Sequence, residues 1–357
     1  MIRLANWCAE RGLMVDLLVL SNEGPLREQV RGSVNLVSLR CRRAAFALFP
    51  LQRYLRDNTP RLLVASMSHL NVISVLARGT NPHIRVMLLE HRDVTARALL
   101  DPGWKERFLF FIMHWVYPAA QQVAAVSEGA ARSLASTLEL PLHRVAVLPN
   151  SVDVARLKQS AEKPATHPWL LEDDGRPLVS AVGRLVPVKG FIDLLHAFSH
   201  LREKRDARLI IIGEGPQRHE LEELRDRLGL ADVVDFHGYM PDPVSIVGGA
   251  DVFVLSSHSE GQGIVLLEAM AAGTPIVATD CPSGPRELLQ DGEAGLLVPV
   301  GDPEAMADAI DRLLSDDGLR NTLIETGRKR VEQFDIDVIG PHFLSLWPRK
   351  DKPQHLA

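Results

Sequence analysis

The sequence is poor in cysteine, with only Cys8, Cys41 and Cys281 in 357 residues. An odd number of widely spaced cysteines argues against a disulfide framework and against a zinc site built from paired cysteines. Such cysteine usage is typical of a reducing compartment. No apolar run has the length of a membrane span, and no signal peptide is recognisable. The sequence therefore predicts a cytoplasmic protein.

The common phosphate- and metal-binding motifs are also missing. There is no Walker loop, and Gly213-Glu-Gly215 does not complete a dinucleotide fingerprint because Arg218 stands at the place of the third glycine. The one Asp-x-Asp pair of the tail, Asp335 and Asp337, is predicted to be a solvated turn. These absences argue against an NAD-dependent dehydrogenase and against a metal-dependent transferase.

The composition is that of a globular protein, with 46% hydrophobic and 24% charged residues, and the length suits two domains. The charge is uneven. Residues 1–150 hold 18 Lys and Arg against 11 Asp and Glu, whereas the remainder holds 22 against 34. A basic first half facing an anionic surface or acceptor is one interpretation, and chance drift of surface charge is the other.

Short apolar runs separated by helical stretches predict parallel, doubly wound sheets with helices on both faces. The predicted strands are residues 15–20, 62–65, 86–90, 122–126 and 145–148 in the first half, and 178–182, 208–213, 233–237, 251–256, 275–279 and 295–299 in the second. Residues 151–177 have the composition of a linker. We therefore predict domains at 1–152 and 178–335, a linker at 153–177, and a C-terminal helix with a disordered tail at 336–357.

The chain opens with a predicted helix over residues 2–11, before any strand. A doubly wound domain normally opens with a central strand and a glycine turn. Loss of that strand would leave its neighbours with unpaired backbone groups, at about 1–3 kcal/mol for each buried group. We expect the first domain to lack its first strand, either because the true start lies upstream of Met1 or because this is a truncated form.

The most informative segment is residues 260–273, which reads as a glycine loop and a helix after a buried strand. Glu260 lies in the loop and Glu268 in the first turns of the helix. Backbone N–H groups at the helix start, near Gly263 and Ile264, make an anion site. Two carboxylates beside an anion site indicate a ligand with both a diphosphate and hydroxyl groups, as in a nucleotide sugar.

A second loop, residues 183–191, carries Arg184 and Lys189 between flanking glycines. An arginine fork and a lysine point charge at a sheet edge suit a diphosphate. An ordinary basic loop is the alternative, and the neighbouring 260–273 segment favours the diphosphate.

Together these residues resemble family 4 of the retaining glycosyltransferases, and the resemblance covers nearly the whole chain. The matching motifs are the loop 183–190, the pair Glu260 and Glu268, residues 273–275, 126–128 and 150–153. The resemblance implies an α/β fold of the GT-B type, with two facing Rossmann-like domains, the first on the acceptor side and the second binding the nucleotide sugar. Residues 282–288 resemble a variant found in members that build surface polysaccharides from UDP-linked sugars, often N-acetylhexosamines.

The resemblance also implies roles for single residues on the donor. Arg184 and Lys189 would hold the diphosphate, Glu268 would accept hydrogen bonds from the ribose, and Glu260 would face the transferred sugar. The amides of Gly263 and Ile264 would contact sugar hydroxyls or phosphate.

Two further residues complete the implied site. His91 matches the first-domain histidine near the C6 hydroxyl, and Tyr239, in the segment 237–240, would lie near the base. Gln262 departs from the family, which usually has an aromatic residue there. No metal or other cofactor is required, because fixed cations and amides neutralise the leaving group.

Structural alternatives remain for several of these residues. His91 by itself suits a hydrogen-bonded histidine at a strand end, and Glu268 suits a helix-dipole interaction of about 0.3–1 kcal/mol. Arg286 and Glu287 suit bracing of the following turn. The aromatic segment 104–117 is predicted to be a buried helix, and a membrane-facing helix is the alternative. Five arginines of the same half would favour the membrane: Arg40, Arg42, Arg43, Arg53 and Arg56.

The sequence thus predicts a retaining, metal-independent glycosyltransferase that moves a hexose or N-acetylhexosamine from a UDP-sugar to a glycan or lipid-linked acceptor. Its partners would be the donor and the acceptor, with peripheral contact to an anionic membrane at the inner face of the plasma membrane and no nucleic acid. The alternatives are a non-catalytic nucleotide-sugar binder and a nucleotide-sugar epimerase.

Overall fold

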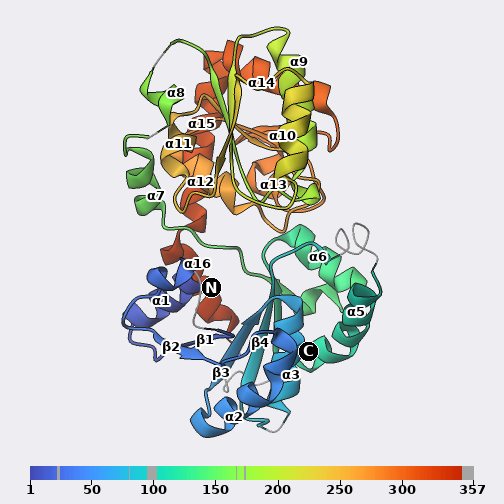
Figure 1. The fold of residues 1–357 in the computed structure, drawn as a ribbon. Coiled ribbons are helices and arrows are strands. Elements are labelled where there is room, and N and C mark those ends of the chain that lie inside the picture. The colour runs from blue at the N-terminus through green and yellow to red at the C-terminus, as the bar shows by residue number, and fades with distance from the viewer. Residues whose placement is uncertain (22–24, 80, 95–102, 166, 173, 348–357) are drawn as a thin grey trace. The chain divides into compact units, whose positions relative to one another are not determined.

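The computed structural model describes residues 1–21, 25–79, 81–94, 103–165, 167–172 and 174–347 (Figure 1). The chain divides into two compact units, Met1–Ser151 with Ile336–Ala357, and Val152–Asp335. The predicted disordered tail from Pro348 onward lies outside the described residues.

The second unit is built on a parallel sheet of six strands. In chain order the strands are β7 (Leu178–Val182), β8 (Arg208–Ile212), β9 (Val234–Gly238), β10 (Val252–Leu255), β11 (Ile276–Thr279) and β12 (Leu296–Val298). Their order across the sheet is β12-β11-β10-β7-β8-β9. The winding direction reverses between β7 and β10, and ligands of such sheets bind beyond the carboxyl ends of the strands at this switch point.

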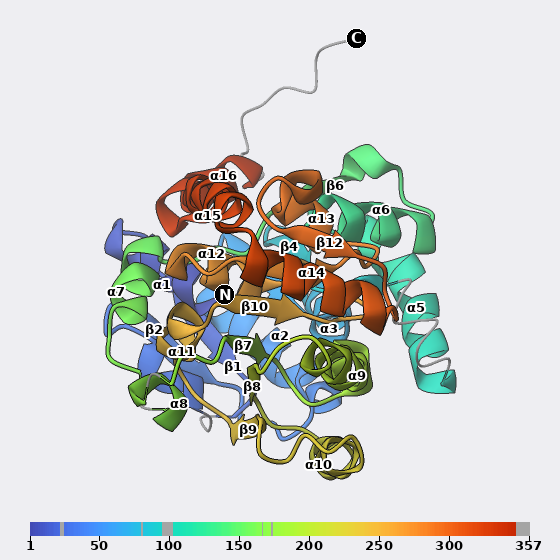
Figure 2. The same cartoon turned by 90° about the horizontal axis from the view of Figure 1, so that it is seen from above.

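Helices cover both faces of this sheet (Figures 1 and 2). They are α7 (Val154–Ala161), α8 (Pro168–Leu171), α9 (Phe191–Arg202), α10 (Arg218–Arg227), α11 (Val244–Gly249), α12 (Ile264–Ala272), α13 (Pro285–Leu288), α14 (Pro303–Ser315) and α15 (Asp317–Val331). Alternate residues of each strand face opposite layers. Val252 and Val254 pack with α9 and α14, whereas Phe253 and Leu255 pack with α11 and α12. Burial on both faces explains why these strands read as continuous apolar runs.

The first unit has two parallel sheets. One pairs β1 (Asp16–Val19) with β2 (Asn35–Ser38), and the other has the order β3 (Leu62–Ser66), β4 (Arg85–Glu90), β5 (Gln122–Ala125) and β6 (Val145–Val147). The helices are α1 (Ile2–Glu10), α2 (Leu48–Asn58), α3 (Ser68–Arg78), α5 (Trp104–Val116), α6 (Glu128–Thr137) and α16 (Ile336–Leu346). Strand β2 is missing from the sequence prediction, because residues 35–38 lie among polar and charged residues without a longer apolar run.

The sheet of β1 and β2 is separate from the four-stranded sheet. Within the described residues, no strand pairs with both β1 and β3. Helices α1 and α16 pack together on β4 and β5 through Trp7, Met87 and Phe343, among others. These two helices bury one face of the four-stranded sheet.

Two segments differ from their predicted form. Helices α7 and α8 occupy part of the stretch predicted as a linker and pack within the second unit. The Asp-x-Asp pair is bonded as well as solvated: Asp335 accepts the Val154 N–H at 3.0 Å, and Asp337, whose side chain is 68% exposed, accepts the Trp7 Nε1–H at 2.7 Å. Both partners lie far away in the sequence, so local composition could not indicate these bonds.

Helix α5 is not the buried helix that its aromatic content predicts. Met113 is its one fully buried residue within the described chain, whereas Trp104, Phe108, Phe111 and Trp115 have exposed fractions of 57–73%. These four follow the spacing i, i+4, i+7 and i+11, so they share one helix face. The opposite face packs on α3, and the helix has aromatic residues on both sides.

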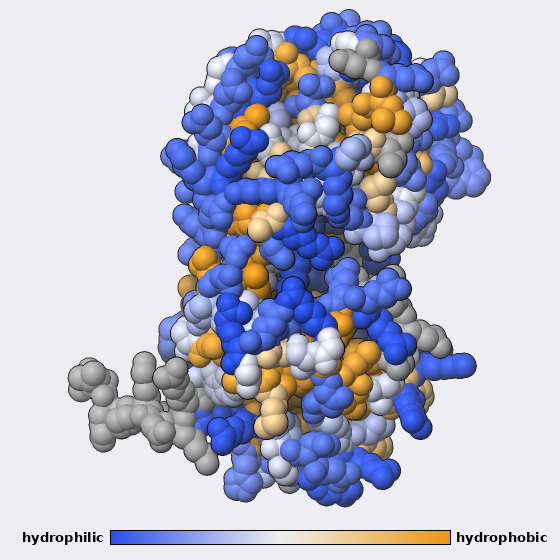
Figure 3. Space-filling view, turned by 90° about the vertical axis from the view of Figure 1, so that its left-hand side faces the viewer, coloured by the Kyte–Doolittle hydropathy of each residue, from blue (hydrophilic) through white to orange (hydrophobic). Residues whose placement is uncertain are grey.

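The surface in Figure 3, seen from the left of Figure 1, is mainly hydrophilic, with hydrophobic residues in small groups. Among the described residues, no helix is both long and apolar enough to cross a membrane.

Candidate nucleotide-sugar site

The loops that follow β7 and β10 meet at the switch point of the second unit. The Ser256 hydroxyl donates to the Lys189 carbonyl at 2.9 Å, and the His258 N–H donates to the Val188 carbonyl at 2.8 Å. These bonds join the two segments that the sequence selected, although about 70 residues separate them in the chain.

Lys189 and Glu260 form an ion pair in this place. Lys189 Nζ lies 2.5 Å from Glu260 Oε1, and the exposed fractions of the two side chains are 23% and 10%. The Ser257 hydroxyl donates to the same carboxylate oxygen at 2.7 Å. The carboxylate is therefore fixed by two partners, and it holds the ammonium group at the carboxyl edge of the sheet.

The loop that carries Arg184 is also bonded to the loop that follows β8. Leu185 N–H donates to the Glu214 carbonyl, and Gln217 N–H donates to the Leu185 carbonyl, both at 3.0 Å. A Cβ atom at Gly213 would lie 1.8 Å from the Gly183 carbonyl oxygen, so only glycine allows this approach. Gly213 thus allows the backbone after β8 to pack against Gly183, where the basic loop begins. The incomplete dinucleotide motif did not indicate this role.

Arg184 itself is exposed at the tip of this loop. Within the described part of the chain, its side chain has no hydrogen bond or ion pair. A guanidinium group that is not used internally can bind a ligand phosphate without breaking an existing contact.

Helix α12 begins beside the ion pair. Its N-cap is Gly263, and among the described residues no side chain caps the backbone N–H groups of this first turn. Ile264 is the first helical residue, and the half-buried Glu268 lies one turn further on. The uncapped N–H groups form the anion site that the sequence predicted.

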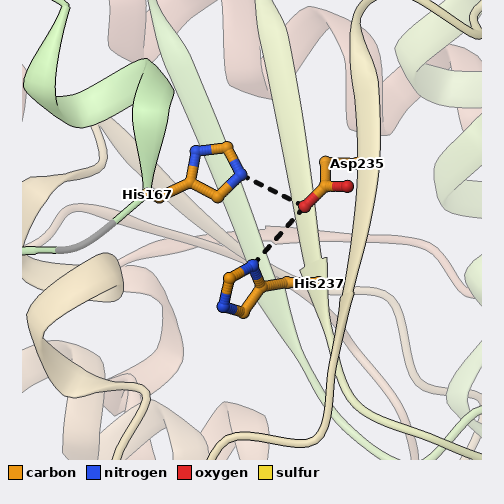
Figure 4. A group of neighbouring side chains, drawn as sticks. All are labelled: His167, Asp235 and His237. Atoms are coloured by element: carbon orange, nitrogen blue, oxygen red, sulfur yellow. Dashed lines mark hydrogen bonds and ion pairs between the residues drawn. The ribbon is translucent and has the colours of Figure 1, made fainter.

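Tyr239 follows β9 and has an exposed fraction of 60%. His237 stands two residues before it in the chain, and its side chain converges with those of His167 and Asp235 (Figure 4). His167 Nδ1 accepts the Trp169 N–H at 3.2 Å, so its proton belongs on Nε2, which lies 3.1 Å from Asp235 Oδ2. His237 Nδ1 lies 3.6 Å from the same oxygen.

The ligand atoms of this group lie within 4.8 Å of one another, a spacing that a metal ion can bridge. A metal on His167 Nε2 would move the ring proton to Nδ1, where it would face the Trp169 N–H. The hydrogen-bonded arrangement therefore suits a network that fixes α8 to β9.

His91 belongs to the first unit, directly after β4. Its Nδ1 lies 3.1 Å from Asn150 Oδ1, which can only accept, so the ring proton is on Nδ1 and Nε2 keeps its lone pair. Burial lowers the pKa of His91 to about 4, although the Asn150 hydrogen bond opposes this shift. At neutral pH the ring is uncharged, which suits a hydroxyl ligand better than a phosphate.

Several supporting residues were not selected from the sequence. They are Ser257 and Ser283, which bond Glu260, and Asn150, which orients His91. Single serines and asparagines give no sequence signal of their own. Only their place in two recognised motifs, 150–153 and 282–288, could have indicated Asn150 and Ser283.

Two parallel α/β units, the second with a cation–carboxylate pair and an uncapped helix start at its switch point, define a protein of GT-B architecture. The family model described as "Glycosyl transferases group 1" matches residues 162–330, and the one described as "Glycosyltransferase Family 4" matches residues 1–156. The chain belongs to glycosyltransferase family 4.

The relatives include a protein named for lipopolysaccharide core biosynthesis and one named for transfer to a diphospho-undecaprenol-linked sugar. The lipopolysaccharide core biosynthesis glycosyltransferase LpsE of Rhizobium meliloti is 38% identical over 175 residues, which are 49% of this chain and 50% of that relative. The chain thus aligns with about half of the length of that protein. A Campylobacter jejuni N-acetylgalactosamine-N,N'-diacetylbacillosaminyl-diphospho-undecaprenol 4-alpha-N-acetylgalactosaminyltransferase is 31% identical over 265 residues, covering 74% of this chain and 70% of the relative.

Among solved structures, HepE of Anabaena in complex with UDP-glucose is similar with a TM-score of 0.79. The identity is 19%, and the match covers 96% of this chain and 93% of that one. This similarity confirms the predicted α/β fold of two Rossmann-like units.

Proposed function

We propose that this protein transfers a hexose or N-acetylhexosamine from a UDP-sugar to a glycan or lipid-linked acceptor, with retention and without a metal ion. The observation that carries the proposal is the Lys189–Glu260 ion pair at the switch point, beside the exposed Arg184. The names of the Rhizobium and Campylobacter relatives support polysaccharide and diphospho-undecaprenol-linked acceptors. The UDP-glucose complex of HepE supports the nucleotide.

In the proposed reaction, Arg184 and Lys189 neutralise the diphosphate as the bond between the sugar C1 and the phosphate oxygen breaks. An acceptor hydroxyl attacks C1 from the same face and gives its proton to the departing phosphate. Glu260 orients the sugar and Glu268 the ribose. Neutral His91 exchanges a hydrogen bond with a sugar hydroxyl, and Tyr239 lies against the base.

Ligand-observed NMR against UDP-, GDP- and ADP-sugars tests the donor. We expect saturation transfer to UDP-sugars only, together with formation of UDP when an acceptor glycan is added. Equal signals from all three nucleotides would contradict the base assignment, and no signal from any would contradict the proposal. Conversion of the donor sugar without acceptor would indicate an epimerase instead.

We also propose that the first unit contacts an anionic membrane through the exposed face of α5. Four aromatic residues on one face form an apolar surface that proteins in water rarely expose. Tryptophan favours the lipid–water interface, and the exposed Lys105 and Arg107 on the same helix complement anionic headgroups. Five exposed arginines of the same unit add to this charge: Arg40, Arg42, Arg43, Arg53 and Arg56.

Vesicle flotation tests the membrane contact. We expect the protein to float with vesicles of anionic phospholipid at low salt and to stay behind with zwitterionic vesicles. Trp104→Ser combined with Trp115→Ser should lower the partition constant at least about tenfold, because two large apolar side chains lose their transfer energy. Leu171→Ser, which removes an exposed apolar side chain of the second unit, is the control. Unchanged flotation of the double variant would refute the role of α5.

A further inference from the structure

A pocket of about 620 Å³ lies within the second unit, where β10, β11 and β12 end. His258 follows β10, Asp280 follows β11, and Arg286 belongs to α13, which Figure 2 shows close to β12. Residues 297–300, at the end of β12, complete the lining. The volume falls within the roughly 300–1,000 Å³ that small-molecule sites occupy. None of the predicted donor residues lines it.

The polar part of the lining is an ion-pair cluster. Arg286 Nε donates to Asp280 Oδ1 at 2.9 Å, Arg286 Nη2 donates to Asp280 Oδ2, and Arg286 Nη1 donates to Asp291 Oδ1 at 3.2 Å. This confirms the bracing role predicted for Arg286. Two carboxylates neutralise the guanidinium, so this part of the lining does not favour a phosphate. The carboxylate oxygens keep lone pairs that can accept from hydroxyl groups.

His258 adds a further polar atom to the lining. Its Nε2 lies 2.6 Å from Asp193 Oδ2, which accepts a hydrogen bond, so the Nε2 proton is used inside the protein. Nδ1 has no partner within the described residues. It can accept a hydrogen bond from a ligand hydroxyl.

The rest of the lining is apolar. It includes Pro282, Pro299 and Val300, and the exposed fraction of Val300 is 39%. A pyranose ring has an edge of hydroxyl groups and a face of C–H groups. The pocket lining offers hydrogen-bond acceptors and apolar surface, which match these two parts of the ring, and it carries no net positive charge for an anionic ligand.

The loop that carries Glu260 also carries His258 of the pocket lining, and His258 N–H donates to the Val188 carbonyl of the basic loop. The Ser283 hydroxyl donates to the Glu260 carbonyl at 2.6 Å. The backbone of Gly284 packs so closely on Gln262 that a Cβ atom would lie 2.6 Å from the Gln262 carbonyl oxygen. The pocket therefore adjoins the loop of Glu260, the residue proposed to orient the transferred sugar, and its one lining cation, Arg286, is paired with carboxylates.

We propose that this pocket binds a neutral sugar unit of the acceptor. That the bound sugar belongs to an acceptor rests on the proposed transferase function. The existence of the site rests on the pocket and its lining. Asp280 and His258 Nδ1 accept hydrogen bonds from the hydroxyl groups. Pro299 and Val300 contact the C–H face of the ring.

Saturation-transfer NMR with a panel of methyl hexosides and methyl N-acetylhexosaminides, with and without UDP, tests the proposal on the full chain. We expect signals from at least one glycoside that persist when UDP is saturating. Val300→Trp should fill the pocket and lower the glycoside signal at least fivefold, with UDP binding unchanged. Val338→Trp, an exposed valine of α16, is the matched control. Arg286→Ala is a second variant that disrupts the ion-pair cluster of the lining.

The results separate the two proposals. Glycoside signals that vanish with UDP, or that survive both Val300→Trp and Arg286→Ala, overturn the acceptor pocket. Absence of signal from every glycoside of the panel also overturns it. Failure of UDP to bind, with glycoside binding intact, contradicts the transferase function and leaves a separate sugar site.

Discussion

Replacing Lys189 by alanine is expected to lower kcat/KM for sugar transfer by about 100- to 1,000-fold, the usual effect of losing one preorganised group that stabilises developing charge. The variant removes the ammonium group that neutralises the diphosphate. It also leaves Glu260, with an exposed fraction of 10%, without its cation beside an anionic ligand. UDP affinity, measured by calorimetry, should fall at least about tenfold for the same reason.

The control for this prediction is Lys158→Ala. Lys158 Nζ lies 2.6 Å from Glu332 Oε1, and both side chains are about half exposed. Exposed pairs of this kind contribute about 0–1 kcal/mol, so transfer and UDP binding should stay near wild type. If Lys189→Ala binds UDP as tightly as Lys158→Ala does, Lys189 does not hold the diphosphate.

Gly213→Ala is expected to destabilise the second unit by at least about 3 kcal/mol, at the upper end of overpacking effects. The new Cβ atom would lie 1.8 Å from the Gly183 carbonyl oxygen, and neither backbone segment is a flexible side chain that can move aside. Urea unfolding followed by circular dichroism measures the loss. Because Gly183 precedes Arg184, UDP affinity should fall as well.

Gly229→Ala separates steric contact from backbone strain. Gly229 has a φ of +69°, and a Cβ atom there meets nothing within 4 Å. Alanine at this position should cost about 1–2 kcal/mol from the left-handed backbone alone. Equal losses for the two variants would show that the 213 loop relaxes and that its contact with Gly183 is not limiting.

The strands of the second unit were predictable because both faces of each strand are buried. Apolar runs such as those within residues 208–212 and 251–256 predicted the strands. Their alternation with helical stretches predicted that the sheet is parallel. Strand β2 was not predictable, since its four residues include two polar ones and are partly exposed. Helix α5 was predicted in the right place with the wrong burial. The aromatic composition of α5 suggested that the whole helix is buried. Only the face that packs on α3 is buried.

In the candidate site, too, local sequence indicated the residues, and tertiary packing set the distances between them. Glu260, Lys189 and Arg184 could be selected from the sequence, because each stands in a glycine loop after a predicted strand. Their distances could not be predicted, since the Lys189–Glu260 pair depends on β7 and β10 being neighbours in the sheet. The contact of Gly213 with Gly183 depends equally on the pairing of β7 with β8.

The sequence by itself determined the fold class, the switch-point loops and the residue types that suit a nucleotide sugar. These follow from periodicity and local backbone chemistry, which act within a few residues. Only the tertiary structure decided which carboxylate fixes Lys189, which histidine nitrogen is left for a ligand, and that β10, β11 and β12 end around a pocket without a net cation. Those features join segments 20 to 70 residues apart, because strand order in the sheet, and not chain order, sets which side chains meet.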